Sequence, residues 1–405
     1  MLIILVIFNL FLFNSCSSEE SSPKVEIQSQ SFNDIAKLSK IEEIAKKNDE
    51  IYNSRNNSIT NAVRIASDAV VGINVTETKR VVYRDQLSPF ANDEFFGRFF
   101  RRFRSTPRVR EYEVKGLGTG FIISPDGYIL TNNHVAGNAS KIVITTTDGK
   151  EYEAEIIGTD FTTDVSLLKI SGKNDFPFIK MANSDDLIIG EWVIAMGNPF
   201  GLFDKNAKPT VTVGVVSNMG VDFAQEDNGD YRVYKGMIQT DAAISSGNSG
   251  GPLINAAGEV IGMNTIIFST ATDGKGAGSI GIGFSIPINR VAKIVDKLIS
   301  HRTLKRNFYT GIDVKQLDSK LSNYLDIKQD RGLIIYSILK NSPAHLAGLE
   351  PGDLILSIND NKIMNQEDFI IATYDNFVSD KLEFRILRNG KEQIKTLILV
   401  PRPGE

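Results

Sequence analysis

Residues 247–252 read Gly-Asn-Ser-Gly-Gly-Pro, and the whole chain holds only three histidines to serve the serine in this segment. A serine hydroxyl is a poor nucleophile unless a neighbouring base takes its proton. Glycines on both sides of Ser249 permit a tight backbone bend, with N–H groups directed to the place where an oxyanion would form. The position of the histidine that can act as this base therefore restricts both the possible reaction mechanism and the possible fold.

The three histidines have different surroundings. His301 ends an amphipathic segment and precedes Arg302, and His345 lies in a separate segment far beyond the serine. His134 follows Leu-Thr-Asn-Asn at an expected strand end, within the same stretch of short expected strands as the serine. The sequence predicts His134 as the base.

A third member of the site should be a carboxylate that orients the imidazole and stabilises its protonated form. Asp164 opens the apolar run Val-Ser-Leu-Leu, which reads as a strand and would bury the acid. The near rival Asp160 precedes Phe-Thr-Thr and reads as a turn residue. The order His134, Asp164, Ser249 matches chymotrypsin-like double β-barrels, and differs from the orders in subtilisins and α/β-hydrolases. The predicted fold is mostly β.

Short strands broken by Gly, Pro, Asn and Asp agree with this fold. The first barrel is expected from residues 118–124, 128–131, 141–147, 152–158 and 165–170. The second barrel is expected from residues 192–196, 210–218, 237–240, 260–265 and 281–286. His134 and Asp164 then belong to one barrel and Ser249 to the other, so the site should lie between them.

Several of these stretches resemble the HtrA/Deg family of serine proteases. They are residues 116–170, 195–201, 239–244 with the Ser249 loop, and 281–287, within a resemblance that spans roughly residues 60–402. The resemblance implies a catalytic triad of His134, Asp164 and Ser249. It also implies an oxyanion loop of Gly247, Asn248 and Ser249, with the N–H groups of Gly247 and Ser249 as donors.

Substrate preference is expected from the residues before the serine. In trypsin-like proteases the base of the primary specificity pocket lies six residues before the nucleophile, which here is Ala243, followed by Ile244. A pocket without an acid should favour small aliphatic residues over Lys or Arg. Asp241 is expected to make structural hydrogen bonds instead.

Residues 306–402 resemble a PDZ domain, a module that binds an extended peptide as an added strand. The position of the motif implies a carboxylate-binding loop at Tyr309, Thr310, Gly311 and Ile312. A helix over residues 365–374 is expected to line the groove, and peptides are the expected partners.

Two segments are expected to be loops. Residues 78–115 carry five phenylalanines between arginines. Such a loop can dock on protein, bind single-stranded nucleic acid or bind an anionic membrane surface. A net charge of −4 predicts no nucleic-acid partner for the whole molecule, and docking of the phenylalanines on protein, for example on a neighbouring subunit, is favoured. The resemblance implies a similar loop that helps family members to assemble trimers and to cover the active site. The phenylalanines are Phe95, Phe96, Phe99, Phe100 and Phe103. The acidic segment 220–236 has Val221 where family members often have an arginine, and Arg232 is a candidate substitute.

The N-terminus indicates export from the cytoplasm. Residues 2–13 are apolar apart from Asn9, too short to span a bilayer but suited to a signal peptide. Cys16 follows directly and resembles a bacterial lipoprotein processing site, which predicts a periplasmic protein tethered to a membrane by lipid. Ordinary signal cleavage is the alternative.

The expected organisation is an export segment at 1–16, a tether and amphipathic helix at 17–57, a protease domain at 58–303 and a PDZ domain at 304–405. Three histidines and one cysteine predict neither a metal site nor a cofactor. The expected function is ATP-independent endoproteolysis of unfolded or damaged proteins in the cell envelope. The alternatives are a regulatory protease of an envelope stress response, or chaperone-type binding of unfolded chains.

Overall fold

The computed structural model describes residues 32–83, 108–172, 174–198, 208–227, 229–245, 247–265, 281–301, 304, 306–324 and 331–403. These form two compact units, Met1–Asn56 and Asn57–Glu405. In the first, helix α1 spans Phe32–Ser54, which confirms a helix within the segment 17–57, where one was expected. Among the described residues, no helix is long and apolar enough to cross a membrane.

The second unit opens with helix α2, Ser58–Ala66, and a short 3-10 turn, η1, Ser67–Ala69. The Asn57 side chain accepts a hydrogen bond from the Thr60 N–H, and the Thr60 hydroxyl accepts one from the Asn57 N–H. This reciprocal capping satisfies two N–H groups that a helix end leaves without partners. Ala62 and Ala66 then bury the inner face of α2 in the protein core.

The first barrel is a closed sheet with the strand order β1-β2-β3-β6-β5-β4. Its interior is apolar, with Ile73, Ile129 and Leu168 fully buried. Alternate side chains of a strand point to opposite faces, so β6 sends Leu168 inward and Leu167 toward the second barrel. The strands are β1 Val70–Tyr83, β2 Arg108–Ile122, β3 Tyr128–Thr131, β4 Lys141–Thr145, β5 Glu151–Asp160 and β6 Val165–Ile170.

The second barrel closes in the order β10-β11-β12-β9-β8-β7. Val193, Val216, Ile238 and Leu253 fill its interior. The strands are β7 Trp192–Gly197, β8 Thr210–Asp227, β9 Asp230–Thr240, β10 Pro252–Ile254, β11 Val260–Thr265 and β12 Gly283–Pro287. A 3-10 turn, η2, Ser184–Asp186, precedes this barrel.

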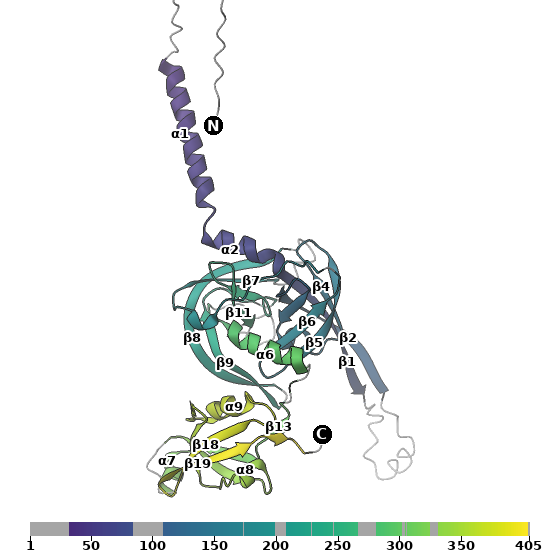
Figure 1. Cartoon of the computed structure of the whole chain (residues 1–405), viewed down its shortest axis with the longest axis vertical. Helices are drawn as coiled ribbons and strands as arrows, with labels where there is room; N and C mark the ends of the chain where they lie inside the picture. The colour runs from purple at the N-terminus through teal and green to yellow at the C-terminus, as the bar shows by residue number, and fades with distance from the viewer. Residues whose placement is uncertain are drawn as a thin grey trace, which may run out of the picture. The chain divides into compact units, whose positions relative to one another are not determined.

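A shared core joins the two barrels. Phe121 and Leu167 of the first barrel and Met196 and Met263 of the second belong to one buried cluster. Helix α6, Ile288–His301, adds its buried face to the same cluster and contacts strands of both barrels. Figure 1 shows α6, in green, lying across the blue and teal strands. The barrels are thereby held as one body.

The strand predictions are confirmed in part. All ten expected strands are present, but each barrel also has a strand that was not predicted, β1 and β10. The loops expected at 78–115 and 220–236 are wrong at their ends. Strands β1 and β2 stay paired out to Tyr83 and Arg108, and β8 and β9 stay paired out to Asp227 and Asp230. β-Branched and aromatic residues in these extensions favour pairing over a loop.

The PDZ part is a sheet with the order β14-β15-β16-β18-β19, in which β17 pairs with β16. Its helices are α7 Ser319–Tyr324, α8 Pro343–Leu346 and α9 Gln366–Tyr374. The Asn365 side chain caps α9, which confirms the helix expected at 365–374. The strands are β14 Ile312–Gln316, β15 Leu333–Ile338, β16 Leu354–Ile358, β17 Asn361–Lys362, β18 Lys381–Arg388 and β19 Lys391–Ile398, with a separate pair of β13 Phe308–Tyr309 and β20 Val400–Pro401.

The linker between barrel and PDZ sheet is tied to both. Arg306 forms a two-bond ion pair with Asp160, at 2.8 and 2.9 Å, and also donates to the main-chain oxygens of Tyr374 and Asn376. The reading of Asp160 as an exposed turn residue is wrong, because it ends β5 and is 3% exposed. The turn that the sequence suggested begins at the next residue and leads to Asp164.

Candidate active site

His134 lies in α4, Asn133–Ala136, a one-turn helix directly after β3. The Asn133 N–H and the Asn132 side-chain amide both donate to the main-chain oxygen of Asp164, at 3.1 Å each. The His134 N–H donates to the Asp164 carboxylate at 3.0 Å. These bonds fix the start of α4 against the β5–β6 turn, so that the imidazole and the carboxylate share one rigid frame.

Asp164 has a left-handed backbone, with φ of 59°, in the turn before β6. This region is uncommon for residues other than glycine, and Asp is among the few that adopt it. The conformation directs the fully buried carboxylate toward α4, where Oδ2 lies 2.8 Å from His134 Nδ1. The structure thus brings two of the three predicted triad residues into direct contact.

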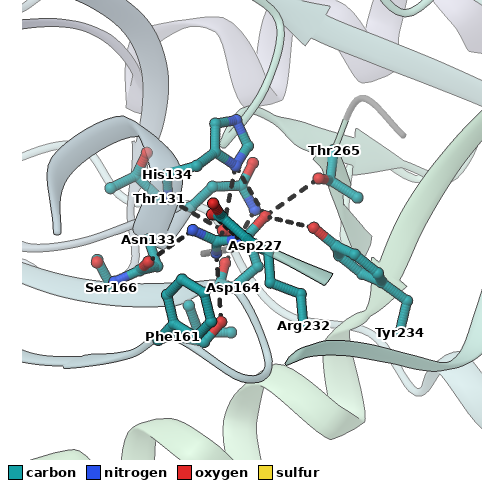
Figure 2. A network of polar contacts seen from close by, with 12 residues as sticks. Thr131, Asn133, His134, Phe161, Asp164, Ser166, Asp227, Arg232, Tyr234 and Thr265 are labelled. Atoms are coloured by element: carbon teal, nitrogen blue, oxygen red, sulfur yellow. Dashed lines mark hydrogen bonds and ion pairs between the residues drawn. The ribbon is translucent and has the colours of Figure 1, made fainter. Parts of the chain in front are cut away.

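Further donors surround the Asp164 carboxylate (Figure 2). Arg232 donates from Nη1 to Oδ1 at 2.7 Å. The Tyr234 hydroxyl and the Thr265 hydroxyl donate to Oδ2 at 3.3 and 3.2 Å. A buried carboxylate is costly unless it is paired and hydrogen-bonded, and here both oxygens are satisfied.

These contacts decide the ionisation of the site. Burial by itself raises the pKa of Asp164, but the charges of His134 and Arg232 and the hydrogen bonds from His134 outweigh burial and lower it. Burial and the Asp164 charge raise the pKa of Tyr234, so this phenol remains a neutral donor. Asp164 is therefore held as an anion that can orient an imidazole and stabilise an imidazolium.

The Ser249 loop is held by Thr119 of the first barrel. The Thr119 N–H donates to the Ser249 main-chain oxygen at 3.1 Å, and the Thr119 hydroxyl donates to the Gly247 oxygen. The same hydroxyl accepts from the Asn198 N–H at 2.7 Å. Thr119 thus fixes the main chain on both sides of Asn248, with its N–H group on one side and its hydroxyl on the other, in the loop that carries the predicted nucleophile.

Glycine is required next to the serine. Gly250 has φ of 82°, and a methyl group there would lie 2.3 Å from both the Thr119 oxygen and the Thr131 hydroxyl. A methyl group on Gly251 would lie 2.2 Å from the Met196 oxygen. The glycines therefore allow the loop to pack directly against β2, β3 and β7.

His134 and Ser249 line one cavity of about 440 Å³. Among the described residues, no hydrogen bond joins the His134 imidazole to the Ser249 hydroxyl. Gly247 also lines it, and the other walls come mostly from β1, β2, α4 and the residues that follow α4. They are Val75, Glu77, Val114, Gly116, Leu117, Val135, Asn138 and Ala139. The cavity is open and of a size that admits a peptide segment.

Other expected site residues lie outside this cavity wall. The Asn248 N–H donates to the Ser245 oxygen at 2.9 Å, so this N–H group of the proposed oxyanion loop already has a hydrogen-bond partner. Ile244 is 6% exposed and packs in the core of the second barrel, and the Ala243 oxygen accepts from the Thr212 hydroxyl at 2.8 Å. Asp241 accepts from the Val215 N–H at 2.7 Å, which confirms its expected structural role.

The expected peptide-binding loop of the PDZ part runs from the end of β13 to the start of β14. The oxygens of Thr310 and Gly311 accept from the N–H groups of Ala344 and Leu339, at 3.1 and 2.9 Å. Gly311 has φ of 74°, and a methyl group there would lie 2.2 Å from the Ser342 side chain. The loop is therefore fixed against the start of α8, with Tyr309 and Ile312 in the flanking strands.

Four residues of the site were not predicted as such: Thr119, Arg232, Tyr234 and Thr265. Arg232 was noticed only as a substitute for a missing arginine in the 220–236 segment. Its place beside Asp164 depends on the pairing of β9 with β8, which the sequence alone did not indicate. The remaining predicted residue, Cys16, and the phenylalanines of residues 95–103 lie outside the described residues.

The two closed barrels, a His–Asp pair from one and a serine loop from the other define a trypsin-like peptidase domain, here followed by a PDZ fold. Residues 118–263 match the family of trypsin-like peptidase domains and residues 309–399 match the family of PDZ domains.

Relatives extend the comparison to most of the chain. A protein of Marinomonas sp. (strain MWYL1), named probable periplasmic serine endoprotease DegP-like, is 37% identical over 354 residues, which cover 85% of this chain and 72% of the relative. A protein of the same name from Chlamydia muridarum (strain MoPn / Nigg) is 42% identical over 316 residues, covering 76% and 59%. The chain thus spans less than two thirds of that second relative.

Solved structures agree with the relatives. An HtrA-type protease, AlgW, with a decapeptide is 34% identical with a TM-score of 0.61, over 85% of this chain and 99% of that one. The serine endoprotease from Yersinia pestis is 28% identical with a TM-score of 0.54, over 84% and 97%. The chain therefore belongs to the family of DegP-like, HtrA-type serine endoproteases.

Proposed function

We propose that this chain is an ATP-independent serine endopeptidase of the periplasm that degrades unfolded or damaged proteins. The observation that carries the proposal is the 2.8 Å contact between Asp164 and His134, with His134 and Ser249 lining one open cavity. Names of the relatives support the periplasmic location and the activity.

The contacts assign a role to each residue of the proposed triad. Asp164 holds Nδ1 of His134, which leaves Nε2 to take the Ser249 proton as the hydroxyl oxygen attacks the scissile carbonyl. His134 then gives this proton to the leaving amine, and water hydrolyses the acyl-enzyme at Ser249 by the same route. The Asp164 anion stabilises the imidazolium in both steps.

The proposed oxyanion hole uses the N–H groups of Gly247 and Ser249. Such donors act on charge that develops in the transition state, and removing one typically costs ~10²–10³ in kcat. The support for this role is the fixed loop, since Thr119 bonds to the main-chain oxygens of both residues.

We propose that the enzyme prefers small aliphatic residues at the cleaved bond. The support is the segment Ala243–Ile244, where no acid is present and Ile244 lies in an apolar cluster. Mass spectrometry of cleaved peptides tests this, and a majority of cuts after Lys or Arg would refute it.

The PDZ part is proposed to bind extended peptides through Tyr309, Thr310, Gly311 and Ile312. Strand β14 ends the sheet and pairs on one side with β15, and α9 contacts β14, which together offer an edge for an added strand. A fluorescent peptide with a free C-terminus should bind, and the same peptide amidated at its end should bind more weakly.

The remaining proposals rest on the sequence. We propose a lipoprotein anchored through Cys16 after removal of the preceding segment, a tether to residue 57, a protease domain to 303 and a PDZ domain to the end. Assembly as a trimer or a multiple of trimers, helped by the phenylalanines of residues 95–103, is proposed with them. Fatty-acid labelling of the wild type against Cys16→Ala, and light scattering, test these two points.

Cleavage of unfolded casein by purified protein tests the central proposal. Ser249→Ala and His134→Ala should each lower turnover by several orders of magnitude. Ser300→Ala is the matched control, because this serine is exposed on α6 and bonds only within its own helix among the described contacts. Undiminished cleavage by Ser249→Ala would refute the assignment. If Ser249→Ala instead retains full suppression of casein aggregation, chaperone-type binding coexists with proteolysis.

A further inference from the structure

Arg232 places a cation directly against the carboxylate of the proposed triad. It lies on β9, and its guanidinium reaches the β5–β6 turn of the other barrel. Nη1 donates to Asp164 Oδ1 at 2.7 Å and to the Phe161 oxygen at 3.2 Å, and Nη2 donates to Asn133 Oδ1 at 3.2 Å. The guanidinium also lies 4.1 Å from the centre of the Phe161 ring. Arg232 is 7% exposed, so its position is fixed.

The two oxygens of Asp164 thus differ in their partners. Oδ1 accepts from Arg232 and also lies 3.1 Å from His134 Nδ1, while Oδ2 makes the shorter contact with His134 Nδ1, at 2.8 Å, and, among the described contacts, none with Arg232 (Figure 2). Besides Glu77, which lines the same cavity as His134, charged groups near this arrangement are few among the described residues. Asp227 of β8 lies 3.7 Å from Arg232 Nε and is half-exposed, and Tyr234 is a neutral donor. Asp160, at the other end of the turn, is already paired with Arg306.

We propose that Arg232 is a positioning residue that fixes Asp164 and shares its negative charge, so that it sets the acidic limit of the pH range in which the enzyme is active. The inference rests on the proposed protease function. An isolated anion beside His134 would favour the imidazolium, which cannot act as a base. The permanent cation of Arg232 at Oδ1 opposes protonation of the imidazole, because it offsets the Asp164 anion and repels a second positive charge.

The sign of the effect follows from these charges. Removing the Arg232 charge leaves the Asp164 anion uncompensated, which favours protonated His134. The acidic limb of kcat/KM must then move to higher pH. Direct charge neighbours shift titrations by ~1–3 pH units, and this one acts through Asp164, so a shift of about one unit is expected.

The test is the pH dependence of kcat/KM on a chromogenic peptide, with the full chain and four proteins compared. Arg232→Gln keeps an amide donor without the charge and should move the acidic limb up by about one pH unit. Arg232→Lys restores the charge and should return the limb toward the wild type, at a lower plateau because the two-pronged contact is lost. Tyr234→Phe, which removes an uncharged donor from the same carboxylate, is the matched control and should leave the limb in place.

Folding of each variant is verified by near-ultraviolet circular dichroism. If Arg232→Gln does not fold, Arg232→Met, which also removes the charge, takes its place and should move the acidic limb in the same direction. An active Arg232→Gln enzyme whose acidic limb coincides with that of the wild type overturns this inference alone. A wild type without peptidase activity overturns the proposed function as well.

Discussion

Replacing Arg306 by methionine should destabilise the protein more than replacing a solvent-exposed charged side chain would. The Arg306 and Asp160 side chains are 9% and 2% exposed and share two bonds of 2.8 and 2.9 Å. Methionine preserves most of the volume but leaves the Asp160 carboxylate buried without its cation. Only the Thr163 hydroxyl would remain among its described side-chain partners.

The size of the effect follows from this burial. Removing one partner of a buried ion pair typically costs ~3–5 kcal/mol, because the remaining charge is uncompensated. Asp160→Asn should cost less, since Arg306 would keep the oxygens of Tyr374 and Asn376 and the face of Phe377. The double variant removes both charges, so its cost should fall below the sum of the single costs by at least ~2 kcal/mol.

Urea unfolding of the full chain, followed by circular dichroism, measures all three variants. Arg290→Met is the matched control, because Arg290 also bridges the barrels and the PDZ part, through Asp375 at 2.6 Å, but both side chains are nearly one-fifth exposed. This control should cost about 1 kcal/mol. Strict additivity of Asp160→Asn and Arg306→Met would refute the reasoning, since it would mean that the two charges do not interact.

Three other outcomes are expected. The free energy of unfolding of the wild type should exceed that of Asp164→Asn by its full amount above about pH 5, because the folded-state pKa of Asp164 is lowered. This difference should shrink as the pH falls below the ordinary pKa of a carboxyl group. Denaturation at several pH values measures the difference, and a constant value would contradict the prediction. Thr119→Val should lower kcat by roughly tenfold to a hundredfold with KM little changed, because the loop that carries Gly247 loses a bond, and Thr119→Ser should recover most of it; equal loss in both variants would show a packing role. Gly250→Ala should abolish labelling by a fluorophosphonate, because the added methyl group would collide with Thr131; full labelling would disprove this packing.

The residues of the site were predictable where the signal is local. His134 at a strand end, Asp164 before an apolar run and Ser249 among glycines each have a recognisable immediate context. The strand cores were predictable for the same reason, because alternation of apolar residues is a short-range pattern.

Contacts between distant segments were not predictable. Arg232 and Asp164 are 68 residues apart, and Arg306 and Asp160 are 146 apart. Each pair requires two strands or a linker to be positioned first, and nothing in a window around Asp160 distinguishes a buried ion pair from a solvated turn. The acidic composition of residues 220–236 also hid a hairpin, because its charges lie on a strand pair and not in a loop.

Closure of the two barrels limits the strand edges with which the proposed substrates, unfolded chains, could pair. Unfolded chains pair readily with unpaired strand edges, and such pairing seeds aggregation. Each barrel sheet closes on itself, so open edges among the described barrel strands are confined to the parts of β1 with β2 and of β8 with β9 that pair only with each other. Open edges remain on β14 and β19 of the PDZ sheet, and β19 carries Lys391 and Lys395, which discourage pairing. Within the PDZ sheet, strand addition is thereby directed toward β14, the edge at which peptide binding is proposed.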